Sequence, residues 1–101
     1  MYAVIFRAEI ASVDAAYAAA AQRLRQIALE RYGCLDFVSV CEDKQEIAIS
    51  YWPDAASIAA WKADAEHQTA QEQGRGFWYG AYQVEVARIE RRYRYEKGAP
   101  R

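Results

Sequence analysis

The chain begins with an alternating pattern that predicts a β-strand. Within residues 2–10, Tyr2 and Val4 share one face, while Ala3 and Ile5 share the other. Because both faces start apolar, we expect this strand to be covered on two sides.

A helix is predicted directly after the strand. Its apolar side chains step by three and four residues, which places them on one face. They are Val13, Tyr17, Ala20, Leu24 and Ile27. Ser12 or Asp14 can cap the amino end of this helix, and Gly33 is well placed to end it.

A hairpin and a second helix come next. The hairpin consists of two strand-like segments, residues 34–41 and 46–52, joined by the polar residues 42–45. Pro53 ends the second segment, and Asp54 is a suitable N-cap for the helix that follows.

The second helix is predicted to run without a break from Asp54 to Gly74. Ile58 and Trp61 lie on its apolar face. At 100° per residue, Trp61 and His67 would lie about 240° apart on such a helix. The two side chains would therefore reach one pocket only if the helix bent between them, and the sequence shows no clear break there.

The last strand is predicted over residues 81–93, after a short aromatic turn at residues 77–80. Residues 96–101 are expected to be a flexible tail, which leaves residues 1–95 as the domain. Basic residues near the end of this strand alternate with glutamates, which favours a solvated strand edge or a set of salt bridges across a dimer. They are Arg88, Arg91, Arg92 and Arg94.

The order β-α-β-β-α-β indicates an α+β fold on the ferredoxin-like plan, in which two helices cover one face of a four-stranded antiparallel sheet. The other face needs a cover, because neither alternating set in the third strand is polar. Ile47, Ile49 and Tyr51 alternate with Ala48, Ser50 and Trp52. We therefore expect a homodimer in which two sheets pack face to face.

Composition excludes several classes of protein. The 101 residues carry a net charge of −1, without the surplus of lysine and arginine that nucleic-acid binding requires. No membrane span of about 18 apolar residues and no signal-peptide pattern is visible. Cys34 and Cys41 would lie roughly 23 Å apart in one predicted strand, which is too far for a disulfide bond. Two free thiols are typical of a reducing compartment, so we expect a cytoplasmic protein. A single histidine, His67, excludes a multi-histidine metal site within one chain.

Spaced aromatic elements give the chain a resemblance to the antibiotic biosynthesis monooxygenase family, over about residues 2–93. They are Ile49-Ser50-Tyr51-Trp52, Ile58-Ala59-Ala60-Trp61-Lys62, Ala65-Glu66-His67, Gln71 to Gly74-Arg75, Trp78-Tyr79 and Tyr82-Gln83-Val84. The resemblance implies a dimeric α+β barrel. Some members oxygenate aromatic polyketides without metal or flavin, and others bind and degrade haem. The asparagine that characterised members use has no counterpart, because this chain contains none.

His67 and Arg7 are the candidate catalytic residues. His67 has the ordinary pKa range of a general base, or could ligate haem iron, or could simply bond to a neighbouring carboxylate or the backbone. Arg7 could hold an anionic ligand or a developing oxyanion, or could pair with a carboxylate such as Asp36.

Five aromatic side chains are candidates for binding a small aromatic substrate, with filling of the core as the alternative. They are Trp61, Trp78, Tyr82, Trp52 and Phe37. The resulting hypothesis is a cofactor-independent monooxygenase that oxidises a small aromatic or polyketide-like substrate with O2. The alternatives are a haem-binding or haem-degrading protein and a non-catalytic dimeric domain that binds a small ligand.

Overall fold

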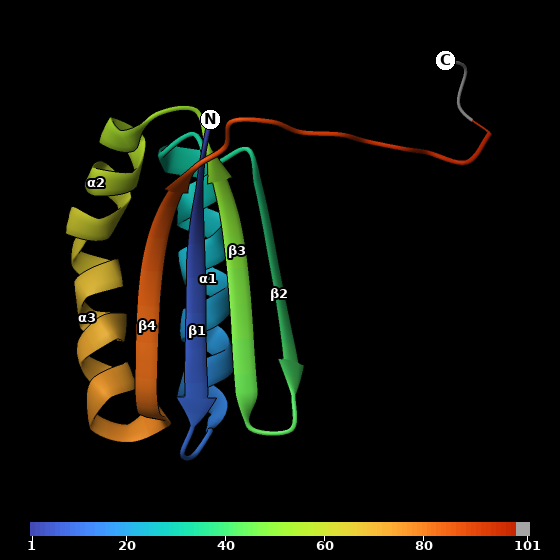
Figure 1. The fold of residues 1–101 in the computed structure, drawn as a ribbon. Coiled ribbons are helices and arrows are strands. Elements are labelled where there is room, and N and C mark those ends of the chain that lie inside the picture. Colours follow the sequence, from blue (N-terminus) through green and yellow to red (C-terminus); the bar gives the residue numbers. More distant parts are fainter. Residues whose placement is uncertain (99–101) are drawn as a thin grey trace.

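The computed structural model describes residues 1–98, which form a four-stranded antiparallel sheet with its helices on one side (Figure 1). The elements are β1 (Tyr2–Ile10), α1 (Ala15–Arg31), β2 (Asp36–Glu42), β3 (Gln45–Trp52), α2 (Ala55–Ala63), α3 (Ala65–Gln73), the π-helical turn η1 (Gly74–Trp78) and β4 (Tyr79–Arg88). The strand order is β2-β3-β1-β4. This arrangement confirms the predicted ferredoxin-like α+β fold.

Local signals set both ends of α1. Asp14, and not Ser12, is the N-cap, and its Oδ1 accepts a hydrogen bond from the Tyr17 amide at 2.8 Å. The Ser12 hydroxyl instead donates to the Phe77 carbonyl at 3.0 Å. Gly33, just beyond the helix, has a φ of +76°, a left-handed conformation that glycine adopts without strain.

The second helical region is not continuous, so that prediction is wrong. Asp64 leaves the helical conformation with a φ of −60° and a ψ of 137°, which ends α2 and allows α3 to start afresh. At the other end, Gly74 does not stop the helix, because the chain continues through η1 to Trp78.

Gly74 is required for a close approach between η1 and the first residue of β4. A Cβ atom at this position would lie 2.9 Å from both Cδ2 and Cε2 of Tyr79. We therefore expect Gly74→Ala to lower the free energy of unfolding by about 1–3 kcal/mol, the usual range for overpacking. Urea denaturation measures this change. The matched control is Gly76→Ala, since nothing lies within 4 Å of a Cβ at that position. Equal losses in the two variants would contradict the packing argument.

Strand boundaries differ from the predicted ones at two places. β2 begins two residues later than expected, and Cys34 lies before it. β4 starts earlier than residue 81 and ends well before residue 93. Cys34 is buried and Cys41 is exposed, and both are free thiols.

Beyond β4 the chain leaves the sheet. The Ile89 amide still donates to the Met1 carbonyl at 3.0 Å, after which residues 90–98 run outward as an extended segment, here called the arm (Figure 1). Of the predicted tail, residues 96–98 belong to the arm, and residues 99–101 lie outside the described residues.

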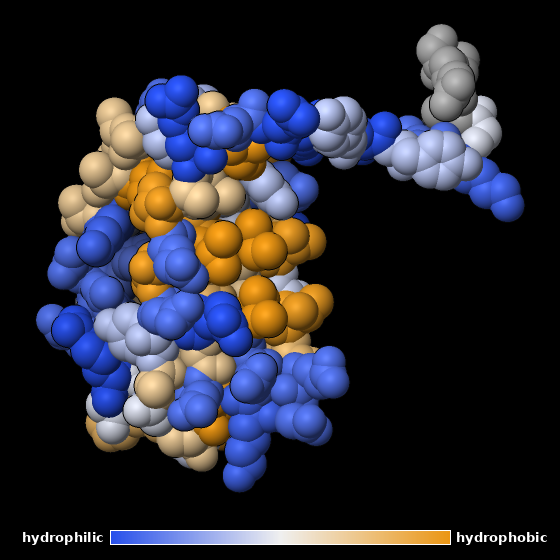
Figure 2. All heavy atoms as spheres, viewed as in Figure 1, coloured by the Kyte–Doolittle hydropathy of each residue, from blue (hydrophilic) through white to orange (hydrophobic). Residues whose placement is uncertain are grey.

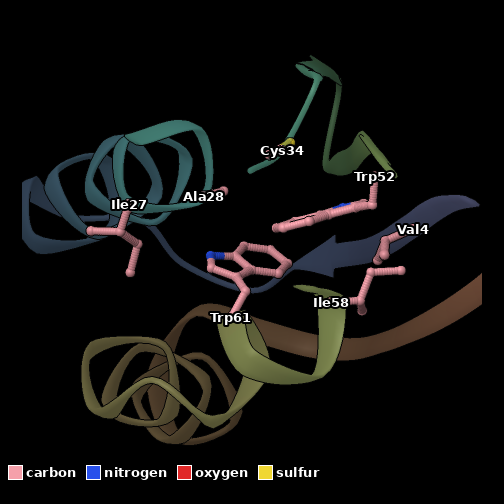
Figure 3. Close-up of a cluster of buried hydrophobic side chains, with 7 residues drawn as sticks. All are labelled: Val4, Ile27, Ala28, Cys34, Trp52, Ile58 and Trp61. Atoms are coloured by element: carbon pink, nitrogen blue, oxygen red, sulfur yellow. The ribbon is translucent and has the colours of Figure 1, made fainter. Parts of the chain in front are cut away.

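The hydrophobic core lies between the sheet and the helices (Figure 3). Its members come from β1, α1, the loop before β2, β3 and α2. They are Val4, Ile27, Ala28, Cys34, Trp52, Ile58 and Trp61. Figure 3 shows the two indole rings of this core facing each other between α1 and α2.

The opposite face of the sheet, here called the open face, is apolar over β2 and β3. Val38 and Val40 are 52% and 64% exposed, and their cross-strand partners Ile49 and Ile47 are partly exposed. Figure 2 shows hydrophobic side chains gathered over these strands. Within residues 1–98, no helix or other segment therefore packs over most of this face. No helix in the same residues is long and apolar enough to cross a membrane.

Candidate active site

The break between α2 and α3 shapes the candidate site. The Asp64 amide donates to the Trp61 carbonyl at 3.1 Å, and Asp64 Oδ1 accepts from the Glu66 amide at 2.8 Å. Asp64 Oδ2 accepts from the Tyr32 hydroxyl at 2.6 Å and lies 3.6 Å from Arg31 Nη1. The bond from Tyr32 holds the pKa of the Asp64 carboxyl below its ordinary value of 3.8. A charged side chain thus fixes the bend.

The bend brings Trp61 and His67 together. Their ring centroids are 4.4 Å apart and the ring planes meet at 83°, an edge-to-face contact. The expected separation of 240° assumed one continuous helix. The overlooked signal was Asp64 itself, since aspartate is a preferred N-cap even inside a segment of helical composition.

Substituting Asp64 tests this account of the bend. Asp64→Ala removes the N-cap of α3 and leaves the Tyr32 hydroxyl without its partner. We expect the midpoint of thermal unfolding to fall by about 4–8 °C, the shift that loss of one cap produces in a domain of this size. Asp64→Asn keeps a capping oxygen and should lose less than half as much. Scanning calorimetry compares the two, and equal losses would show that charge matters more than capping.

The surroundings of His67 favour its neutral form. Its side chain is partly buried, and burial lowers the pKa of the imidazole below its ordinary value of 6.5. Nδ1 is buried and has no hydrogen-bond partner in the structure. Buried polar atoms normally have partners, so an orphan nitrogen next to Trp61 marks this histidine as unusual.

Trp52 and Trp61 belong to the core. Trp52 is fully buried, its ring centroid lies 5.1 Å from that of Trp61, and its Nε1 donates to Ser50 Oγ at 2.8 Å. Trp61 Nε1 donates to the Leu24 carbonyl at 3.3 Å, and Phe37 contacts the Trp61 ring edge-to-face at 6.1 Å. Of these three candidate binding residues, only Trp61 also touches His67.

A second aromatic cluster surrounds a buried carboxylate at the other end of the same layer. Glu46 is only 6% exposed and accepts a hydrogen bond from the Tyr79 hydroxyl at 2.8 Å. Burial, with this bond in addition, raises the pKa of Tyr79 far above its ordinary value. Tyr17 stacks edge-to-face on Tyr79, and its own pKa is raised by burial and by Glu46. Sequence analysis did not single out Glu46.

Trp78 and Tyr82 border this second cluster. Trp78 is buried, and its Nε1 donates to Asp14 Oδ1 at 3.2 Å. The Tyr82 ring lies 6.0 Å from that of Tyr79, and its hydroxyl accepts from Gln71 Nε2 at 3.4 Å. Trp78 therefore belongs to the buried interior, whereas the Tyr82 hydroxyl connects β4 to α3.

A strip of apolar surface lies along β4 beside α3. His67 and Gln71 are one turn apart on α3, so they share a face, and the contact of Gln71 with Tyr82 turns that face toward β4. On β4, Val84 and Val86 follow Tyr82 on the same face of the sheet, yet they are 50% and 56% exposed. The helices therefore leave this strip uncovered, and we take it, with the α3 face that carries His67 and Gln71, as the candidate substrate site.

Arg7 does not reach this site. It lies exposed on the open face, opposite Ile47 and Gln83 on the neighbouring strands. A shallow groove of about 250 Å³ runs beside it. Asp36 pairs with Tyr51, four residues along β3 from Ile47, so it is not the ion-pair partner that we expected.

Comparison with known proteins identifies a relative of this chain. No protein-family model matches it. YqjZ of Bacillus subtilis, an uncharacterised protein, is 40% identical over 91 residues, which cover 89% of this chain and 80% of YqjZ. The chain belongs to the same family as YqjZ.

Several solved structures have the same fold as this chain. SnoaB from Streptomyces nogalater, described as a cofactor-independent oxygenase, matches with a TM-score of 0.76 at 12% identity, over 90% of this chain and 94% of SnoaB. An antibiotic biosynthesis monooxygenase matches with a TM-score of 0.65 at 16% identity, over 88% and 98% of the two chains. The resemblance seen in the sequence is thus confirmed at the level of the fold.

The side chains that could bind a metal ion or a haem iron are few. Within residues 1–98, no group of three histidine, cysteine, aspartate or glutamate side chains is placed to hold a metal ion. The orphan Nδ1 of His67 has almost no exposed surface, so that nitrogen does not reach a haem iron unless α3 moves. The same burial keeps Nδ1 from a substrate proton, so Nδ1 alone does not separate an acid–base role of His67 from ligation of iron.

Proposed function

We propose that the protein is a cofactor-independent monooxygenase of the antibiotic biosynthesis type, which oxidises a small aromatic or polyketide-like substrate with O2. The observation that carries this proposal is the orphan, partly buried His67, which shares a face of α3 with Gln71, the residue that contacts Tyr82 on the strand with the uncovered apolar strip. The fold shared with SnoaB, whose description names a cofactor-independent oxygenase, supports the same reaction class.

In the proposed reaction the protein supplies a base and an apolar surface. A flat substrate lies against Val84 and Val86, and neutral His67 removes a proton from an activated carbon of the substrate through Nε2, since Nδ1 is buried. The resulting carbanion adds O2, and the protonated His67 returns the proton to give a hydroperoxide. Loss of water, with cleavage of the O–O bond, leaves a carbonyl group on that carbon. In this proposal the hydroxyl of Tyr82 and the amide of Gln71, which contact each other at 3.4 Å, orient the substrate oxygen.

We also propose that two copies form a homodimer through the open face. The open face carries an apolar surface whose exposure to water is unfavourable. It consists of the exposed Val38 and Val40 together with Ile47 and Ile49. A second copy would supply the same apolar surface. Light scattering at micromolar concentration should give twice the mass of one chain, and the mass of one chain would overturn this proposal. A cytoplasmic location is part of the proposal too, since both cysteines are free thiols.

Oxygen uptake tests the reaction. The protein, treated with a metal chelator, is given anthrone-like and quinol substrates in an oxygen electrode. Uptake of one O2 per substrate, without added flavin, metal or haem, would support the proposal. Saturable binding of these compounds with no uptake would instead indicate a ligand-binding domain.

A haemin titration separates the remaining alternative. Visible absorption is followed for the unsubstituted protein and for His67→Ala. We expect no saturable Soret shift, since His67 acts as the base in the proposed reaction and its Nδ1 is covered. A shift that His67→Ala abolishes would make haem the ligand and His67 its axial residue.

A further inference from the structure

The second aromatic cluster contains a buried carboxylate that the proposed reaction does not use. Glu46 is only 6% exposed, and no ion pair involves it within residues 1–98. Its partner is a phenol, since the Tyr79 hydroxyl donates to Glu46 Oε2 at 2.8 Å. Burying a carboxylate away from any cation is costly, and ionisable groups in such unusual surroundings gather at functional sites. Glu46 therefore calls for a role besides packing.

A row of four aromatic rings passes through this cluster. In order they are Tyr82, Tyr79, Tyr17 and Trp78, here called the aromatic row. The ring centroids of successive members lie 6.0, 6.1 and 5.5 Å apart. The row lies where α3 leads into β4, beside the start of α1 (Figure 1). Because Tyr82 contacts Gln71, that end of the row borders the candidate substrate site.

Carboxylates lie on two atoms of the row that lose a proton on oxidation. Removing one electron turns a phenol or an indole into a strong acid, so the electron leaves readily only where a base accepts the proton. Glu46 accepts the O–H of Tyr79, and Asp14 Oδ1 accepts the Nε1–H of Trp78 at 3.2 Å. Burial and the nearby Glu46 raise the pKa of Tyr79 far above its ordinary value, so the phenol keeps its proton until the ring is oxidised.

We propose that the aromatic row is a redox relay, which carries oxidising equivalents away from the candidate substrate site and holds them on Tyr79, with Glu46 as the proton acceptor. Packing alone accounts for four rings in contact, but it does not account for a buried carboxylate on the phenol. The use of this relay rests on the proposed monooxygenase reaction, whereas the oxidation of the row does not depend on it.

The oxidant is an alkoxyl radical, which forms when the O–O bond of the hydroperoxide breaks with one electron left on each oxygen. This radical takes one electron from Tyr79 through Tyr82 and one proton from water, and becomes an alcohol. The O–H bond of Tyr79 breaks, its proton moves to Glu46, and a phenoxyl radical remains. A thiolate from solution then returns one electron and becomes a thiyl radical, while the proton moves back from Glu46 to Tyr79.

Flash photolysis tests the relay without any substrate. A short ultraviolet pulse ejects an electron from tryptophan, and the resulting indolyl radical absorbs at a different wavelength from a phenoxyl radical. We expect a phase in which the phenoxyl signal rises as part of the indolyl signal decays, at a rate independent of protein concentration. Trp78→Phe should remove the phase that belongs to the row, and Tyr79→Phe, which keeps the ring, should remove the same phase.

Two further variants separate proton transfer from packing. Glu46→Gln keeps an oxygen that accepts the hydrogen bond but loses the base, so it should slow the phase by about 10²-fold, as loss of a positioned proton acceptor does. Tyr93→Phe is the matched control, because Tyr93 is 84% exposed on the arm and should not take part. Circular dichroism establishes that each variant is folded before its kinetics are compared.

The outcomes separate the relay from the proposed reaction. Absence of the phenoxyl rise in the unsubstituted protein overturns the relay, and so does an unchanged phase in Tyr79→Phe or an unchanged rate in Glu46→Gln. Loss of the phase in Tyr93→Phe also overturns it, since the radical would then form on the arm. Oxygen uptake is measured separately: uptake without the relay leaves the proposed function standing, and the relay without uptake leaves the redox row standing but removes its use.

Discussion

Trp52→Ala is expected to lower the free energy of unfolding by about 3–5 kcal/mol, the range for removing a large aromatic side chain from a core. Trp52 has no exposed surface and packs against Trp61 at 5.1 Å. Its loss would open a cavity between the sheet and α2. It would also leave the buried Ser50 hydroxyl without the bond from Trp52 Nε1, which adds to the cost.

Urea denaturation followed by circular dichroism measures this effect, at one fixed protein concentration because a dimer would make stability depend on it. The control is Phe77→Ala, since Phe77 is 70% exposed. That variant should stay within about 0.5 kcal/mol of the unsubstituted protein. A loss below about 1 kcal/mol for Trp52→Ala would show that Trp52 is not central to the core.

His67→Ala is expected to lower kcat/KM by about 10²- to 10⁴-fold on a substrate identified by oxygen uptake, the usual contribution of a general base. The pH profile carries a second expectation. Only neutral imidazole accepts a proton, so activity falls as pH drops through the pKa of His67. Because burial lowers that pKa, the midpoint of this fall lies below 6.5. In His67→Ala the fall should disappear.

Arg7→Ala is the matched control for the kinetic test. Arg7 lies on the open face, away from Trp61 and the strip along β4. Its replacement should leave kcat/KM within about twofold. Full turnover in His67→Ala, or a loss of equal size in Arg7→Ala, would contradict the assignment of the base to His67.

Features of the fold that are set by residues close together in the sequence could be predicted. The alternation in β1 and β3 and the caps at Asp14 and Asp54 are local, and the structure has them as expected. The break at Asp64 was also local but was outweighed by an alanine-rich segment of helical composition. Asp64 is stabilised there by Tyr32, a residue 32 positions away that no local pattern connects to it.

The composition of the site could not be predicted for the same reason. Glu46 and Tyr79 are 33 positions apart, and only the pairing of β3, β1 and β4 brings them into contact. Arg7 is a candidate from the sequence because it is a charged residue in an apolar strand, and His67 because it is the single histidine. Arg7 lies on the open face of the sheet and His67 on α3, on the other side of the sheet, so the tertiary fold separates them.

The positions of the three tryptophans have an optical consequence. Trp52, Trp61 and Trp78 are 0%, 7% and 4% exposed, so the emission of the folded protein should be blue-shifted as a whole. The first two indoles are 5.1 Å apart and tilted by 37°, close enough for their electronic transitions to couple. Trp78 sits in the other aromatic cluster, beside Tyr17. The two ends of the interior therefore have separate spectroscopic reporters, without any added label.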